Sequence, residues 1–133
     1  MKTKLALGIA ALGMVLASVP AIAHHSFAAE FDSAKPIKLT GSVTKIEWMN
    51  PHAYFYIDVK DAAGKVTTWG LEMGSPNGLM RQGWTRNSMK VGDEIVVEGS
   101  RAKDGSDIAN ARSVVLGSGE RLFAASSQDN QRQ

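Results

Sequence analysis

The amino-acid sequence predicts an all-β domain, and three observations lead to this. Short segments with alternating apolar and polar residues recur along the chain, separated by turns rich in Gly, Pro and Asp. The first such segment is long and changes its pattern midway, as a strand does when it bends around a barrel. One short helix is predicted, between the third and fourth strands. Together these features favour a small five- to six-stranded Greek-key barrel of OB type, with an open sandwich as the alternative.

The predicted strands are residues 37–48, 53–60, 66–73, 94–101, 109–116 and 120–123. In the first strand the apolar face changes after Val43, and Gly41 stands in the middle, which indicates a bulge. The helix is expected after Ser75, which can cap it, with Pro76 at its first position. Leu79 and Met80 would supply its apolar contacts.

The first 23 residues are expected to be a signal peptide. Lys2 and Lys4 precede an apolar run, residues 5–19, and residues 20–23 fit the small-residue pattern that signal peptidase reads. The run is shorter than the roughly 20 residues that span a bilayer. We therefore expect cleavage after Ala23 and a periplasmic or secreted protein, with no stable membrane insertion after cleavage.

Charge and cysteine content narrow the classes of function. Loss of Lys2 and Lys4 would reduce the 15 basic residues to 13, equal to the 13 acidic ones. A nucleic-acid-binding domain usually carries a basic surplus, so nucleic acid is not an expected partner. The chain has no cysteine, which leaves no disulfide and no thiolate metal site. We expect one barrel domain at residues 24–123, with an N-terminal arm at 24–36 and a disordered tail at 124–133.

The second strand carries the main candidate site. Its apolar residues alternate with Tyr54 and Tyr56, and the same parity places His52 on the tyrosine face. The outer face of strands 2 and 3 is the usual ligand platform of OB barrels. We therefore expect a small molecule or a protein segment to bind there, on His52, Tyr54, Tyr56, Thr68 and Glu72. The plainer interpretation is that the tyrosines only shield a sheet face covered by the N-terminal arm.

The three histidines offer an alternative function, copper binding. Cleavage after Ala23 would leave His24 with a free α-amine beside its own imidazole. His25 or His52 could complete a set of nitrogen ligands, which Cu(II) favours. A flexible end with adjacent histidines also binds copper adventitiously, so the pattern alone does not establish a metal site.

Enzymatic activity is not expected. Acid–base catalysis would need a pair drawn from Glu47, His52, Asp58 and Glu72. The sequence has no nucleophile elbow, no His-Glu-x-x-His and no Gly-rich phosphate loop. A binding domain is therefore the favoured class.

Several short segments together resemble a known family. They are residues 23–27 (AHHSF), 39–43 (LTGSV), 47–52 (EWMNPH), 74–77 (GSPN), 81–86 (RQGWTR), 92–93 (GD) and 101–112. The chain is similar in these segments to small exported bacterial proteins of the domain-of-unknown-function family 6152. The resemblance covers roughly residues 24–123 and implies an exported domain of this size. It supplies no established activity and no catalytic residue.

Overall fold

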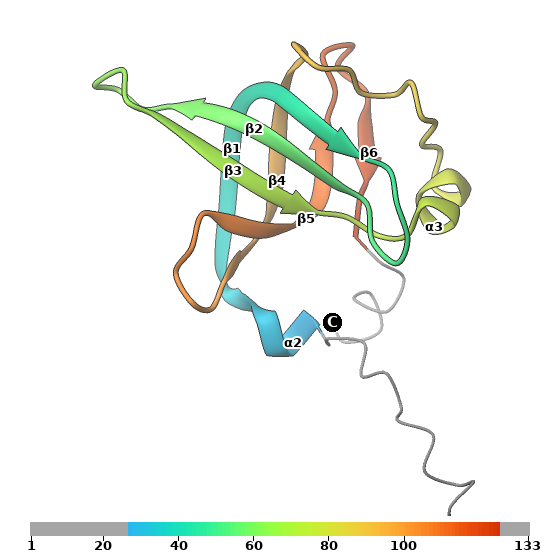
Figure 1. Ribbon diagram of the computed structural model, residues 1–133, viewed down its shortest axis with the longest axis horizontal. Coiled ribbons are helices and arrows are strands. Elements are labelled where there is room, and N and C mark those ends of the chain that lie inside the picture. The colour runs from blue at the N-terminus through green and yellow to red at the C-terminus, as the bar shows by residue number, and fades with distance from the viewer. Residues whose placement is uncertain (1–26, 126–133) are drawn as a thin grey trace, which may run out of the picture.

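A computed structural model describes residues 27–125 of the chain. Its elements are α2 (Phe27–Glu30), β1 (Phe31–Glu47), β2 (Tyr54–Lys60), β3 (Val66–Glu72), α3 (Pro76–Arg81), β4 (Glu94–Ala102), β5 (Ile108–Val115) and β6 (Arg121–Phe123). The strands form one sheet in the order β3-β2-β1-β4-β5-β6, and a parallel pairing of β3 with β5 closes it into a barrel (Figure 1). This order, with a helix between β3 and β4, confirms the predicted OB-type fold.

The long first strand holds the two halves of the barrel together. Its first part pairs with β4 and its last part with β2, and Ser42 pairs with both neighbours. The register shifts between Val43 and Lys45, where the sequence pattern predicted a bulge. Gly41 lies so close to β2 that a Cβ atom there would stand 2.5 Å from the carbonyl oxygen of Asp58. The two strands can therefore approach this closely only because residue 41 has no side chain.

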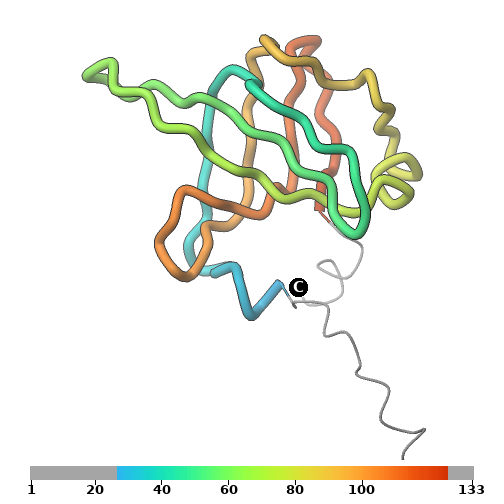
Figure 2. The backbone as a smooth tube through the Cα atoms, viewed as in Figure 1, coloured from blue at the N-terminus to red at the C-terminus, as the bar shows by residue number. Residues whose placement is uncertain are grey.

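The alternation predicted for β2 and β3 is present in the structure. The inner face of this hairpin supplies Phe55, Ile57 and Leu71 to a core that β4 and β5 complete with Val97 and Val114. All five side chains are fully buried. The far end of the hairpin extends beyond the barrel (Figure 2). The apolar period of two therefore fixes which face of β2 and β3 points outward.

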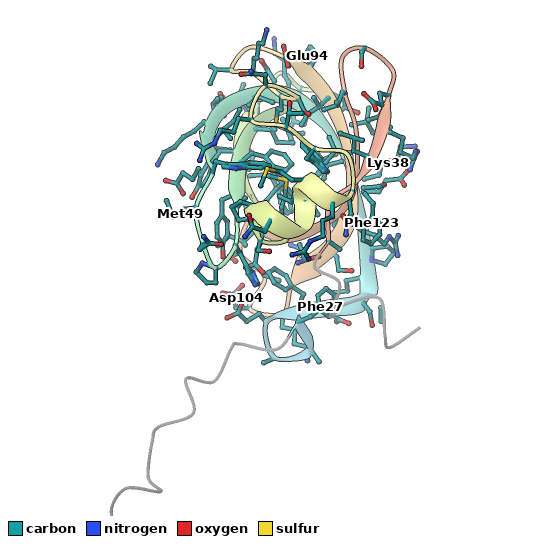
Figure 3. The ribbon with its side chains drawn as sticks, turned by 90° about the vertical axis from the view of Figure 1, so that its right-hand side faces the viewer. Phe27, Lys38, Met49, Glu94, Asp104 and Phe123 are labelled. Carbon is teal, nitrogen blue, oxygen red and sulfur yellow. The ribbon has the colours of Figure 1, made fainter. Side chains whose placement is uncertain are left out.

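The short helix α3 lies across one end of the barrel, as the view of Figure 3 shows. The Ser75 side chain caps it by accepting a hydrogen bond from the amide of Gly78, and Pro76 follows the cap. Leu79 is buried as predicted, but Met80 is 50% exposed, so its predicted apolar contact is wrong. Trp84 is buried after the helix and donates from Nε1 to the carbonyl oxygen of Phe123 at 2.7 Å.

The ends of the domain differ from the predicted boundaries. β1 begins at Phe31 rather than Ile37, so the second half of the expected arm belongs to the sheet. The β1–β4 register shifts between Phe31 and Pro36, the last residue of the expected arm. At the other end Ala124 and Ala125 are buried, and the packed domain continues past residue 123. Residues 126–133 of the expected tail lie outside the described residues, as does the predicted signal peptide.

Candidate functional site

Three of the predicted site residues meet where β2 begins and β3 ends. His52 Nδ1 lies 2.7 Å from Oε1 of Glu72, and the Tyr54 hydroxyl donates to Oε2 of Glu72 at 2.5 Å. Tyr54 and Glu72 are direct cross-strand partners, which explains why their side chains meet. Both oxygens of one carboxylate are therefore occupied by neighbours from the same hairpin.

Backbone contacts hold His52 in place at this end of the barrel. The next residue, Ala53, donates its amide to the carbonyl of Gly74 at 3.0 Å and accepts from the amide of Met73 at 2.8 Å. On the other side, the turn before His52 contains a cis peptide bond between Asn50 and Pro51. The imidazole is therefore attached to a segment that is bonded directly to the end of β3.

Glu72 is buried, although it was predicted on an open outer face. It is only 7% exposed, because its strand pairs there with β5 and places Asn110 beside it. Burial, followed by the hydrogen bond to the Glu72 carboxylate, raises the pKa of Tyr54 above its ordinary value of 10.0. The negative charge of Glu30, the last residue of α2, adds to this rise. Tyr54 is thus a neutral donor throughout the physiological pH range.

The Glu72 contact determines which nitrogen of His52 is open. A carboxylate only accepts hydrogen bonds, so the neutral imidazole must carry its proton on Nδ1 to donate to Glu72. Nε2 then keeps its lone pair, and it makes no hydrogen bond with any described residue. The His52 side chain is 30% exposed, so this nitrogen can be reached from solvent. Histidines that bind metals or accept protons are oriented by a carboxylate in the same way.

Tyr56 belongs to a second, separate group on the outer face. Its hydroxyl donates to Oε2 of Glu47 at 3.2 Å, and Glu47 is ion-paired with Lys45, whose Nζ lies 5.3 Å from the centre of the Tyr56 ring. Burial and the charge of Glu47 raise the pKa of Tyr56, and the hydrogen bond from Lys45 lowers that of Glu47. The Tyr56 ring also packs over Gly70, where a Cβ atom would be 3.3 Å away.

Thr68 lies farther along the hairpin. It donates to Asp58 at 2.6 Å, and this pair is four cross-strand pairs beyond the pair of Tyr54 with Glu72. Thr68 is four positions before Glu72 in β3, about 13 Å at the usual rise per residue. The five predicted ligand residues do share one face, but their contacts fall into three local groups rather than one cluster.

The predicted metal ligands are only partly described. His24 and His25 lie outside the described residues, and His52 is the one histidine within them. Residues 27–125 contain no group of three or more histidine or acidic side chains arranged to hold a metal ion. The helix α2, which follows His25 closely in sequence, is fixed to the β4–β5 loop, since Lys103 donates from its amide to Glu30 O at 2.9 Å and from Nζ to Ala28 O at 2.5 Å.

Three residues near the site were not predicted from sequence. Lys45 reaches Tyr56 because the bulge in β1 sets it opposite that residue. Asn110 is the register partner of Glu72 because β5 closes the barrel. Glu30 acts on Tyr54 from a helix at the start of the domain. The alternating pattern within one strand carries no information about which strands become neighbours.

The described helices are too short to cross a membrane. By its strand order this protein is an OB-type barrel, and a carboxylate–imidazole–phenol group lies at one end of the β2–β3 hairpin. The chain belongs to a family of unknown function, DUF6152, whose model matches residues 11–111.

The remaining comparisons add little about function. No curated protein matches the chain. Among solved structures it is similar to Rim1, a mitochondrial single-stranded DNA binding protein of S. cerevisiae, with 10% sequence identity and a TM-score of 0.49. That similarity covers 62% of this chain and 92% of the other. The nucleic acid in that description is the ligand of Rim1.

Proposed function

We propose that this chain is an exported binding domain without catalytic activity, which holds its ligand on the outer face of β2 and β3 at the His52 end. The observation that carries the proposal is the open Nε2 of His52, opposite a nitrogen that buried Glu72 fixes in place. The hydroxyl groups of Tyr54, Tyr56 and Thr68 already donate hydrogen bonds to carboxylates of the same face. The imidazole is thus the group with free, oriented bonding capacity.

The chemistry of the face defines what kind of ligand fits. Nε2 of His52 accepts a hydrogen bond from an N–H or O–H group, and the half-buried rings of Tyr54 and Tyr56 offer flat apolar area beside it. A small molecule or a protein segment that combines a donor with an aromatic or aliphatic part matches both features. An acidic ligand does not, because Glu47 and Glu72 border the same face.

A fragment screen by NMR tests this proposal. Small aromatic alcohols and amines are added to the ¹⁵N-labelled chain, and amide shift changes are mapped with the wild type and with His52→Phe. We expect changes centred on residues 52–56 and 70–72, which His52→Phe removes while Thr68→Val leaves them in place. Amide shift changes centred elsewhere on the barrel, or shift changes of the same size in His52→Phe and Thr68→Val, would contradict the proposal.

Copper binding is the second candidate, and the Glu72–His52 contact specifically favours it. Metal-bound histidines usually donate their second nitrogen to a carboxylate, and loss of that partner typically lowers metal affinity 10–100-fold. We propose that His52 Nε2, the α-amine and imidazole of His24, and His25 form the ligand set.

Titration with Cu(II) tests the second candidate. The chain processed to begin at His24 is compared with His52→Ala, with Glu72→Gln and with a form that carries one extra alanine before His24. We expect tight one-to-one binding that weakens at least tenfold in all three. Equal affinity in the wild type and His52→Ala would leave only adventitious binding by the N-terminal histidines.

A further inference from the structure

The connection from β3 to β4 carries an unusual distribution of charge. The connection, residues 73–93, contains three basic residues, Arg81, Arg86 and Lys90, and one acidic residue, Asp93, in a chain whose basic and acidic residues are nearly balanced. All three side chains are exposed. Together with the exposed side chains of Met80 and Val91, they make up what we call the basic strip.

The cations of the basic strip are unpaired within the described part of the chain. Elsewhere the exposed cations commonly face a carboxylate, as Lys38 and Arg121 face Glu98. Arg81, Arg86 and Lys90 form no such ion pair with described residues. Asp93 accepts a hydrogen bond from the Lys90 amide through Oδ2 at 2.8 Å, so one carboxylate lies near the end of the strip. The side-chain charges of Arg81, Arg86 and Lys90 themselves stay free of ion pairs with described residues and are available to an external anion.

Apolar side chains accompany these cations. Met80, which precedes Arg81 in the sequence, is 50% exposed, and Val91, which follows Lys90, is 65% exposed. A large apolar side chain next to a cation at both ends of a segment is the composition of surfaces that bind at the membrane interface, where headgroups meet the charges and the upper acyl chains meet the apolar groups.

The shape of the segment also fits a plane of headgroups. From α3 the chain climbs along one side of the barrel to the start of β4 (Figure 2). Arg81 is the last residue of α3 and Lys90 lies four residues before β4 begins, so the backbone positions of these cations are spread along that side. A single bound anion needs convergent donors, whereas a layer of anionic lipids needs charges spread along an accessible edge.

We propose that the basic strip docks this domain peripherally on a membrane surface that contains anionic phospholipid. The attachment is electrostatic, with Met80 and Val91 entering the headgroup layer, and no segment crosses the membrane. Each cation near such a surface contributes about 1 kcal/mol, close to a fivefold gain in affinity. Loss of all three is therefore expected to weaken vesicle binding roughly 100-fold.

Co-sedimentation with vesicles tests the proposal, with each variant prepared in the form processed after Ala23. The probes are vesicles of phosphatidylcholine alone and of phosphatidylcholine with phosphatidylglycerol. We expect binding only to the second kind, which falls as salt is raised and is lost in the triple variant Arg81→Gln, Arg86→Gln, Lys90→Gln.

A second triple variant controls for net charge. Lys60, Lys65 and Arg112 are also exposed and make no ion pair with described residues. Their change to Gln removes the same charge at other places and is expected to leave most of the binding intact. Equal loss in both triple variants, or no preference for phosphatidylglycerol, would overturn the proposal. Tighter binding to polyglutamate or single-stranded DNA than to the vesicles would overturn it in favour of another polyanion.

Discussion

Glu72→Gln is the change that tests the site most sharply, because it keeps the shape of the side chain and removes its charge. The carboxylate of Glu72 accepts from both His52 Nδ1 and the Tyr54 hydroxyl. A glutamine has only one acceptor oxygen, so one of these buried donors would face an NH₂ group. The imidazole can relieve this clash by moving its proton to Nε2, which would close the nitrogen that we propose for ligand binding.

The cost of this change follows from the contacts that are lost. A hydrogen bond to a charged group contributes about 1.5–3 kcal/mol, and one such bond is lost while the other becomes neutral. We expect the free energy of unfolding to fall by about 2 kcal/mol. For a domain of this size that corresponds to a decrease in Tm of roughly 8–16 °C.

Urea denaturation followed by tryptophan fluorescence measures the effect, and Glu47→Gln is the matched control. Glu47 also accepts from a tyrosine, Tyr56, but its side chain is more exposed and it is additionally paired with Lys45. We expect the control to lose clearly less stability than Glu72→Gln. Equal losses in the two variants would refute the view that Glu72 is a buried organising group.

Three further predictions concern the barrel and its tyrosines. Gly41→Ala should destabilise the domain by at least about 2 kcal/mol, because its Cβ would overlap a carbonyl of β2. The control is Gly117→Ala, where the atom nearest to the added Cβ would be 3.5 Å away, and it should change the free energy of unfolding by no more than about 0.5 kcal/mol. Equal losses of stability in Gly41→Ala and Gly117→Ala would contradict this prediction. The two tyrosines, Tyr54 and Tyr56, should ionise later in the native chain than in urea, since their native pKa values are raised. The stabilisation of the fold by the two neutral tyrosines is then complete below pH 10.0 and is lost as the pH rises through their native pKa values. Absorbance titrations that coincide for the native and the urea-unfolded chain would contradict this prediction. Trp84→Phe removes a 2.7 Å hydrogen bond to β6, so hydrogen exchange in β6 should speed up more than in β1.

The local pattern of the sequence was sufficient for the fold and for one side of the site. Alternation along β2 correctly placed Phe55 in the core and His52 on the face of Tyr54. The change of pattern after Val43 correctly marked the bulge in β1. These features depend on neighbouring residues in one strand, where the period of two is decisive.

The burial of Glu72 could not be predicted in the same way. It depends on the parallel pairing of β3 with β5, which joins residues far apart in sequence and leaves no mark in either strand. The start of β1 was missed for a related reason. Pro36 is tolerated within the strand because the β1–β4 register is interrupted next to it, a property that only the paired structure reveals.

The central claim is that Glu72 holds His52 with its proton on Nδ1 and leaves Nε2 open. The most direct measurement is the pair of ¹⁵N ring resonances of His52, recorded with the imidazole in its neutral form and assigned by comparison with His52→Phe. We predict a protonated Nδ1 and an unprotonated Nε2 in the wild type, and the reverse in Glu72→Gln. An Nε2-protonated ring in the wild type, or a mixture of tautomers unaffected by Glu72→Gln, would contradict the claim.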